Sequence, residues 1–194
     1  MLDRPSLTEA LNAVKARFGA IDVLDYFPAP HSPVPGITMA APSEVTVDNL
    51  QPQIEYNFYG AVAAARTVLS AMREAGAGTL LFTTGGGSIN PNPMLGNVSA
   101  AAAALRNWVL NLHNELAGSG VYAAHVAISA WIGDGGPEGI PAATPAQIAP
   151  PVLGALRAPR PARGSFHRLI PPRYVCSPPR AANTPPSPPL PSPP

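Results

Sequence analysis

Residues 54–84, IEYNFYGAVAAARTVLSAMREAGAGTLLFTT, decide how the rest of the sequence is interpreted. Their hydrophobic side chains recur every three or four residues, as on one face of an α-helix. The repeating positions are Ile54, Phe58, Val62, Ala65, Leu69 and Met72. Asp48 is the predicted N-cap of this helix, and the glycines at positions 76 and 78 predict its end. The continuous β-favouring run 79–84 then predicts a strand that is covered on both faces.

The same helix-to-strand order occurs on either side of this stretch. Before it, Ser6 and Glu9 have the spacing of a capping box, a helix is predicted up to Gly19, and residues 20–27 predict a short buried strand. After it, a helix is predicted over about residues 97–117 and a strand over 121–129. The hydrophobic stripe of that helix comprises Leu105, Val109, Leu112 and Leu116. Three consecutive helix–strand units predict a parallel sheet with right-handed crossovers.

The composition changes at about residue 150, which predicts a domain over residues 1–150 and a tail over 151–194. Of the 27 prolines, 14 lie in the last 44 residues, whereas all eleven acidic residues lie in the first 150. The tail carries six arginines and no acid, so the net charge of +1 conceals an acidic domain and a basic tail. Because such a tail cannot bury enough apolar surface to fold, we expect it to be disordered or extended.

Several classes of protein are excluded by residues that the sequence lacks. Cys176 is the single cysteine, so no intramolecular disulfide can form, and a cytoplasmic location is expected. The four histidines have no metal-binding spacing, so no metal site is predicted. No apolar stretch is long enough for a signal peptide or a membrane span, and we expect neither. Trp108 and Trp131 are interpreted as packing residues, and His125 as a hydrogen-bonded histidine of the core or its edge.

Three segments together resemble the short-chain dehydrogenase/reductase family of nucleotide-binding enzymes. FGAIDVLDYFPAP at residues 18–30 is similar to the family segment IDVLVNNAG, and residues 54–84 are similar to the helix and strand that follow it. VSAAAAALRNWVLNLHNELAGSGVYAAHV at residues 98–126 is similar to the catalytic helix and the next strand. The resemblance covers about three quarters of the chain. It implies an α/β fold that is part of a Rossmann-type doubly wound parallel sheet, as in a truncated and divergent member.

The resemblance also implies where the family's catalytic residues would lie. In the family, a tyrosine is the general acid and base, a lysine four residues later lowers its pKa, and a serine orients the carbonyl group. Val98 and Ala102 occupy the tyrosine and lysine positions, and neither side chain can transfer a proton. Thr84 or Ser88 stands where the serine is expected. Asn57 matches a helix asparagine that supports a proton relay in the family. Asn57, Thr84 and Ser88 are therefore the candidate catalytic residues. The alternatives are a helix asparagine that satisfies a neighbouring backbone group, and two turn hydroxyls.

The resemblance implies NAD or NADP as the cofactor and a small-molecule carbonyl or alcohol as the substrate. The family's nucleotide site begins with a strand, a glycine-rich turn and a helix N-terminus that holds the pyrophosphate. No such unit precedes residue 20, and the glycine cluster 133–139 has a different spacing. The N-terminal dinucleotide-binding half is thus predicted to be absent, which would leave residues 20–27 as an exposed parallel edge of the sheet. No cofactor-binding residue is assigned. We expect the family's oxidoreductase activity to be impaired or absent, as in a pseudoenzyme.

Two other functions remain open from the sequence. A non-catalytic module derived from the family would act by dimerising or by binding a small molecule, and the resemblance implies that helices 50–75 and 97–117 pair between subunits. A proline-rich interaction protein would act through the tail, where PPSPPLPSPP suits a proline-recognising domain. Nucleic acid is not an expected partner, although arginines of the tail could contact phosphates. Two hypotheses concern the ends of the chain: a shifted reading frame after about residue 150, and a valine codon used as the initiator.

Overall fold

A parallel sheet organises the structure, which is a computed structural model that describes residues 3–28, 34–136 and 141–157. Its strands are β1 (Val23–Tyr26), β2 (Gly78–Gly85) and β3 (Val121–Ile128). They lie in the order β1-β2-β3, and both neighbouring pairs are parallel. The predicted helix-to-strand order and parallel pairing are therefore confirmed.

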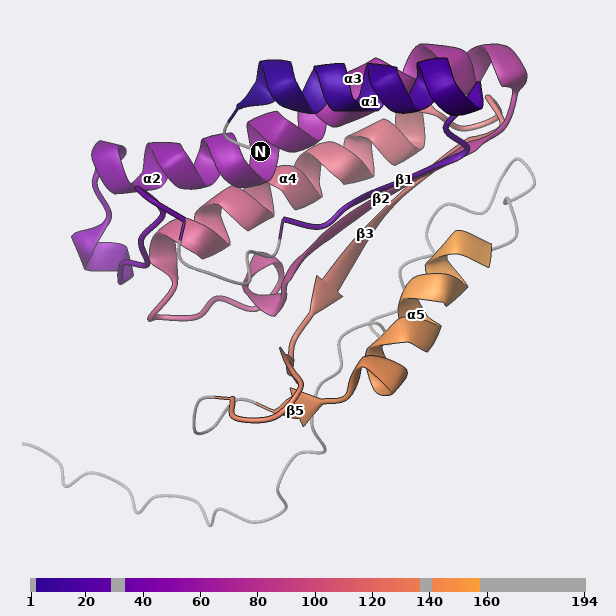
Figure 1. The fold of residues 1–194 in the computed structure, drawn as a ribbon. Coiled ribbons are helices and arrows are strands. Elements are labelled where there is room, and N and C mark those ends of the chain that lie inside the picture. Colours follow the sequence, from indigo (N-terminus) through magenta and orange to yellow (C-terminus); the bar gives the residue numbers. More distant parts are fainter. Residues whose placement is uncertain (1–2, 29–33, 137–140, 158–194) are drawn as a thin grey trace, which may run out of the picture.

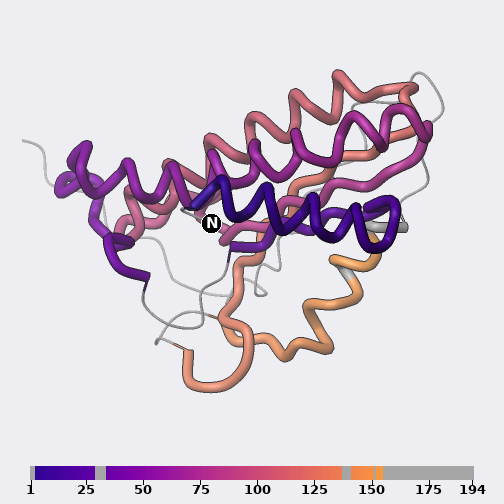
Figure 2. The backbone as a smooth tube through the Cα atoms, turned by 45° about the horizontal axis from the view of Figure 1, so that its top comes forward, coloured from indigo at the N-terminus to yellow at the C-terminus, as the bar shows by residue number. Residues whose placement is uncertain are grey.

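Helices cover both faces of this sheet, as expected for a doubly wound Rossmann-type fold. The helices on one face are α1 (Arg4–Phe18), α3 (Gly60–Ala75) and α4 (Gly96–Glu115). On the other face lies α5 (Pro145–Arg157), which contacts β2 and β3. Figures 1 and 2 both place α5 on the side of the sheet away from α1. Within the described ranges, no helix combines the length and apolar character that crossing a membrane requires.

The hydrophobic core lies between the sheet and the helices α3 and α4. Leu80, Leu81 and Phe82 of β2 are completely buried, so the predicted two-sided burial of this strand is confirmed. The predicted stripe of α4 is confirmed as well, because Leu105, Val109, Leu112 and Leu116 are all buried. Trp108 packs edge-on against Phe82, with ring centroids 5.4 Å apart, as its interpretation as a packing residue requires.

The first helix begins one turn earlier than the sequence predicts. Asp3 is the N-cap of α1, and its carboxylate accepts hydrogen bonds from the Ser6 backbone N–H at 3.1 Å and from Ser6 Oγ at 2.6 Å. The predicted capping box of Ser6 and Glu9 is wrong. The reason is Pro5, which has no N–H and a fixed φ and therefore suits the first turn of a helix rather than the chain before it.

β1 is only half buried, which corrects the prediction of a buried strand. Leu24 and Tyr26 face the core, whereas Val23 is 48 % exposed and Asp25 is also exposed. β1 pairs only with β2 within the described part of the chain, so it forms an edge of the sheet. Burial raises the pKa of the Asp25 carboxyl group, against a smaller opposing effect of a hydrogen bond from Thr83. A charged side chain on such an edge disfavours pairing with another strand.

The predicted single helix after residue 48 contains a wide turn. It consists of α2 (Val47–Ile54), a π-helical turn (Glu55–Tyr59) and α3. Its N-cap is Thr46, which exchanges hydrogen bonds with Asn49 in a capping box, so the prediction of Asp48 as the cap is wrong by two residues. Asn57 Nδ2 donates to the Gln53 carbonyl oxygen at 3.0 Å and thereby competes with the regular backbone ladder. The Gly60 N–H bonds to the Glu55 carbonyl, five residues back, as a π-turn requires.

The π-turn changes which side chains of α3 are buried. A π-turn adds one residue to the helical repeat, so every later side chain is displaced around the helix. The buried positions are Ala61, Ala64, Ala65, Val68 and Met72. Val62 and Leu69, which the uninterrupted repeat predicts to face the core, are only partly buried. Ala65 and Met72 are thus buried as predicted, whereas Ala61, Ala64 and Val68 face the sheet in place of Val62 and Leu69.

The chain after β3 contains two short strands and a helix that were not predicted. β4 (Trp131–Ile132) pairs in parallel with β5 (Ala142–Ala143). Trp131 is 43 % exposed, so its interpretation as a packing residue is wrong. α5 continues through residue 150, where the sequence predicts an end of periodic structure. The remainder of the predicted tail, residues 158–194, lies outside the described residues, and its disorder stays a prediction.

Candidate functional site

Three polar side chains form a hydrogen-bonded cluster at the carboxyl ends of β2 and β3. Thr84 Oγ1 lies 3.0 Å from Ser88 Oγ and 2.9 Å from His125 Nε2. Ser88 Oγ donates to the Gly85 carbonyl oxygen at 3.0 Å. The short 3₁₀ helix Gly86–Ser88 returns Ser88 to Thr84, and the parallel register places His125 beside them. Ligands of open α/β sheets bind outside the carboxyl ends of the strands, so this His125–Thr84–Ser88 cluster is the candidate site.

The histidine of the cluster is neutral at physiological pH. Burial, with a smaller contribution from the positive charge of Arg106, lowers the pKa of His125 from 6.5 to about 4. Thr84 and Ser88 are themselves buried, so water does not solvate the His125 ring from their side. This disfavours the charged form of the imidazole. His125 therefore acts in this cluster as a neutral hydrogen-bonding group rather than as a cation.

Acidification is expected to destabilise the protein through His125. Because the pKa is about 4 in the folded chain and near its ordinary 6.5 in the unfolded chain, the unfolded chain binds the proton first as the pH falls. The stability contributed by the neutral ring is present above about pH 6.5 and is lost toward pH 4, by about 2 kcal/mol when partial solvent exposure is allowed for. Urea unfolding at neutral pH and at pH 4 measures this loss, which should be about 2 kcal/mol smaller in His125→Gln. Equal losses in both proteins would contradict the prediction.

Glycines in the turn after β2 allow two other segments to approach it. A Cβ atom at Gly86 would lie 1.9 Å from Ser129 Oγ, and one at Gly87 would lie 2.5 Å from Ser99 Oγ. Ser129 follows β3, and Ser99 lies in the first turns of α4. Among the described residues, Ser99 Oγ is the buried side-chain polar atom without a hydrogen-bond partner. The turn at Gly86 and Gly87 therefore packs tightly against Ser99, whose buried hydroxyl makes no hydrogen bond.

We expect Gly87→Ala to be destabilising by about 1 kcal/mol, because the new methyl group meets Ser99 Oγ. In a Ser99→Ala background the same substitution should cost less than half as much, since the hydroxyl that obstructs it is gone. Ser99→Ala alone should leave stability unchanged or higher, because it removes an unsatisfied buried group.

Thermal unfolding of the double-mutant cycle measures all three effects. Gly85→Ala is the matched control, because no atom lies within 4 Å of its added Cβ. Equal costs of Gly87→Ala in the two backgrounds would refute the assigned contact.

The first turns of α4 carry no proton-transferring side chain at the positions that the family resemblance identifies. Val98 is partly buried, and Ala102 is 3 % exposed and packs in the interior. A valine and an alanine can contribute apolar contacts only. The start of α4 therefore shapes the site without supplying the acid and base of the family reaction.

Asn97, beside Val98, fixes the start of α4 to two distant segments. Its Oδ1 accepts from the Ala40 N–H at 3.0 Å and from the Val98 N–H at 2.9 Å. Its Nδ2 donates to the carbonyl oxygens of Thr38 at 2.9 Å and of Asn49 at 3.0 Å. Asn97 has no exposed surface, so these four bonds replace all of its contacts with water. Three of its partners are 48 to 59 residues away, so no local sequence pattern predicts the role of Asn97.

Asn57, the third candidate catalytic residue, is held within its own helix. Its Nδ2 donates to the carbonyl oxygen of Gln53 and, at 3.1 Å, to Gln53 Oε1. Gln53 is buried and donates in turn to the Thr38 carbonyl oxygen at 2.8 Å. The structure therefore brings Thr84 and Ser88 together and connects Asn57 to the loop near Asn97 instead.

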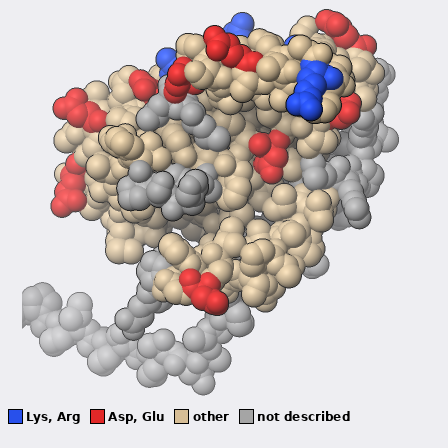
Figure 3. Space-filling view, viewed as in Figure 1, with Lys and Arg blue, Asp and Glu red and all other residues tan. Residues whose placement is uncertain are grey.

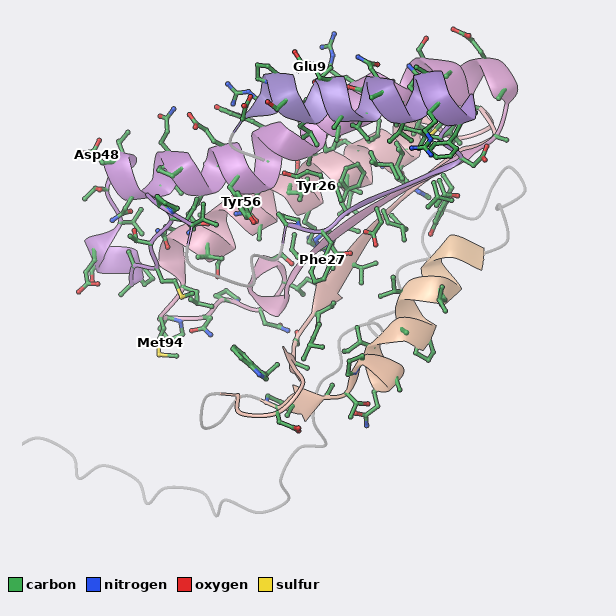
Figure 4. All side chains as sticks on the ribbon, in the orientation of Figure 1. Glu9, Tyr26, Phe27, Asp48, Tyr56 and Met94 are labelled. Carbon is green, nitrogen blue, oxygen red and sulfur yellow. The ribbon has the colours of Figure 1, made fainter. Side chains whose placement is uncertain are left out.

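Two tyrosines near the end of β1 do not replace the missing catalytic pair. Tyr26 donates its hydroxyl hydrogen to the Tyr56 carbonyl oxygen at 2.6 Å, and Figure 4 shows both residues beside Phe27. Burial raises the pKa of both phenols, and the nearby Tyr56 phenol raises that of Tyr26 further. A catalytic phenol needs a cation that lowers its pKa. The single lysine of the chain, Lys15, bonds instead to the Thr67 carbonyl oxygen.

Comparison with known families decides the classification. The family model described as short chain dehydrogenase matches residues 1–131, which is more than half of the chain. The chain belongs to the short-chain dehydrogenase family. No curated protein sequence matches it.

Solved structures with this fold include several dehydrogenases. A short-chain dehydrogenase from Streptomyces avermitilis is 25 % identical with a TM-score of 0.60, and the match covers 81 % of this chain and 58 % of that one. A gluconate 5-dehydrogenase from Burkholderia cenocepacia, solved with NADP and tartrate, is 22 % identical with a TM-score of 0.57, covering 68 % and 49 %. An NADPH-bound short-chain oxidoreductase from Pseudomonas aeruginosa with an atypical catalytic centre is 19 % identical with a TM-score of 0.58, covering 69 % and 49 %. The chain spans about half the length of these structures.

The described residues of this family member do not fit the pyrophosphate of a dinucleotide. Such a group needs free backbone amides at a glycine-rich turn that opens an α-helix. The turn at Gly85–Gly87 opens only a three-residue 3₁₀ helix, and Ser129 and Ser99 already occupy the space beside its glycines. The glycines at 133, 135 and 136 follow β4 instead of a strand that enters a helix. We assign no cofactor-binding residue within the described ranges.

The loops at the carboxyl edge of the sheet carry no basic residue within the described ranges. Every described lysine and arginine lies in α1, α3, α4 or α5. In Figure 3 the basic side chains of the visible face lie over the helices at the top, and none lies on its lower half. The described residues also hold no group of three or more His, Cys, Asp or Glu side chains suited to a metal ion. The described part of this edge thus carries no basic side chain that could pair with an anionic ligand.

Proposed function

We propose that this chain is a short-chain-dehydrogenase-type binding module that holds a small, uncharged carbonyl or alcohol compound without completing the family's proton transfer. The observation that supports this proposal is the pairing of a retained hydroxyl site, Thr84 and Ser88, with apolar residues at the tyrosine and lysine positions. A hydroxyl can orient a ligand oxygen by a hydrogen bond, but Val98 and Ala102 cannot move a proton.

The electrostatics of the site support an uncharged ligand. A carboxylate or phosphate would need a cation or several free amides to replace its hydration. The described loops around the site carry no cation, whereas a ketone or alcohol oxygen needs only one or two hydrogen bonds. Exposed apolar side chains at the same edge, Phe27, Ile89 and Trp131, suit the carbon skeleton of such a compound.

NAD or NADP remains the proposed cofactor only at the level of the family. Two of the similar structures contain NADP or NADPH, and one of them has an atypical catalytic centre. These names support testing both nucleotides with this chain. The poor fit of the described residues to a pyrophosphate predicts weak binding or none.

Turnover and binding measured on the full chain test the proposal. We expect saturable binding of an uncharged cyclic ketone in calorimetry, no binding of a keto acid of similar size, and no oxidation of NADH or NADPH with either compound. Catalytic turnover by the unmodified chain would overturn the proposal. The double variant Val98→Tyr/Ala102→Lys should still bind the ketone, and it should gain reductase activity if it also binds the nucleotide. The apolar control Val98→Phe/Ala102→Met should gain no activity.

Self-association through α3 and α4 is a second proposed role. The outward residues Ala100, Ala103, Asn107 and Asn111 of α4 are exposed and uncharged, so another helix can approach them closely. Sedimentation of the full chain should show a dimer, and Ala103→Glu should convert it to a monomer. Asn12→Glu on α1, also exposed, is the control that should leave the dimer intact. A monomeric unmodified chain would exclude this role.

A further inference from the structure

The hydrogen atoms of the His125–Thr84–Ser88 cluster can be counted. Four contacts have hydrogen-bond length: Thr84 to His125, Thr84 to Ser88, and both Thr84 and Ser88 to the Gly85 carbonyl oxygen. The two hydroxyls supply two hydrogens, and a carbonyl oxygen supplies none. A neutral imidazole carries a proton on only one nitrogen. With that proton on Nε2, three of the four contacts can be hydrogen bonds and the two contacts to Gly85 are alternatives, whereas with it on Nδ1 only two can be.

We propose that His125 is a positioning residue, which donates from Nε2–H to Thr84 Oγ1 and thereby directs Thr84 toward Ser88 and Ser88 toward the Gly85 carbonyl oxygen. Once Thr84 accepts from the ring, its own hydrogen is available to Ser88. Without this donor, either hydroxyl could point in either direction. His125 thus selects one arrangement of a cluster that has no charge to orient it.

A fourth contact explains how Ser88 can be released to a ligand. Thr84 Oγ1 lies 3.1 Å from the Gly85 carbonyl oxygen, close enough to bond to it directly. When Ser88 turns its hydrogen toward a ligand oxygen, Thr84 can turn its own from Ser88 to Gly85, so no buried carbonyl loses its partner. This step rests on the proposed binding function. The orientation of the cluster by His125 does not.

The tautomer of His125 tests the proposal without any ligand. ¹⁵N-edited NMR of the full chain at neutral pH should show the proton of His125 on Nε2. His113 is an internal control, because its proton is expected on the other ring nitrogen. Its Nδ1 lies 2.9 Å from the Ala123 carbonyl oxygen, and a carbonyl oxygen can only accept a hydrogen bond. The histidines at positions 31 and 167 are assigned by substitution. A proton on Nδ1 of His125 would overturn the proposal.

Variants of Thr84 separate positioning from simple packing. Thr84→Val has nearly the same shape but accepts no hydrogen bond, so His125 should lose its preference for Nε2–H and show both tautomers. Thr84→Ser should restore the single tautomer. Unchanged ring signals in Thr84→Val would overturn the positioning role, and His113 should keep its signals in both variants.

Affinity for the uncharged ketone then tests the consequence for binding. Ser88→Ala should weaken binding about tenfold, as expected for one lost hydrogen bond. His125→Leu should weaken it about threefold, whereas His125→Gln, which keeps a donor, should stay within about twofold. Equal affinities of the leucine and glutamine variants would overturn the positioning role. If the unmodified chain binds no ketone while the ring carries its proton on Nε2, the proposed function fails and the positioning role stands.

Discussion

Asn97→Asp is expected to lower the free energy of unfolding by about 4 kcal/mol. Aspartate has nearly the same shape, so the substitution opens no cavity. It keeps the acceptor for Ala40 and Val98 but replaces the amide that donates to Thr38 and Asn49. A carboxylate oxygen would then face two carbonyl oxygens at a position with no exposed surface. Repulsion from these two carbonyl oxygens adds to the cost of burying a charge, although the Thr38 oxygen keeps its bond from Gln53.

Urea unfolding followed by circular dichroism measures this loss. Asn111→Asp, on the same helix, is the matched control, because Asn111 is exposed and bonds only to Asn107 one turn away. It should cost less than about 1 kcal/mol. Similar losses in the two variants would show that Asn97 does not hold the loop and α2 to the start of α4.

Gly120→Ala is expected to destabilise the protein by about 4 kcal/mol, for two separable reasons. Gly120 has a φ of 80°, where a side chain is strained. In addition, a Cβ atom there would lie 1.8 Å from the carbonyl oxygen of Gly76. Gly76 ends α3 and Gly120 precedes β3, so the methyl group would force apart the two turns that lead into neighbouring strands.

Gly118→Ala isolates the first of these reasons. Gly118 has the same φ of 80°, but no atom lies within 4 Å of an added Cβ. Its substitution should therefore cost only the backbone strain, about 1 kcal/mol. The difference between the two variants in thermal or urea unfolding is the cost of separating the turns. A difference near zero would contradict the close approach.

The elements that could be predicted from sequence are those whose burial is set by their own residues. β2 is a continuous β-favouring run with an apolar centre, and α4 keeps an uninterrupted repeat, so both lie where expected with their predicted faces buried. The edge position of β1 was predicted from the missing N-terminal strands, and its pairing with β2 alone among the described strands confirms it. The alternating burial of its residues could not be predicted, because an apolar strand at an edge has the same local sequence as one in the centre. Its exposure depends on which other strands pair with it.

The candidate site was predictable only in part, for a similar reason. Thr84 and Ser88 were candidates because the family resemblance implies a serine at this strand end, and the turn between them brings the two hydroxyls together. His125 and Asn97 act on segments 41 to 59 residues away, which no local pattern encodes. The change in the buried face of α3 could not be predicted from the sequence either. The π-turn depends on whether the Asn57 side chain or a backbone N–H bonds to the Gln53 carbonyl oxygen.

The π-turn at Glu55–Tyr59 also limits how the length of this segment can change in evolution. Loss of one residue within the turn would restore a regular α-helix, so the deletion alone should not break the local hydrogen-bond ladder. It would also leave α3 in its present orientation, because the π-turn already displaces the helix by the one residue that is lost. Ala61, Val68 and Met72 would therefore keep facing the sheet. A one-residue deletion elsewhere in α3 would instead rotate the residues that follow it by about 100°. Lineages that differ in length by one residue at the π-turn should therefore share the same core side chains, whereas a length change elsewhere in α3 requires compensating changes of side-chain size.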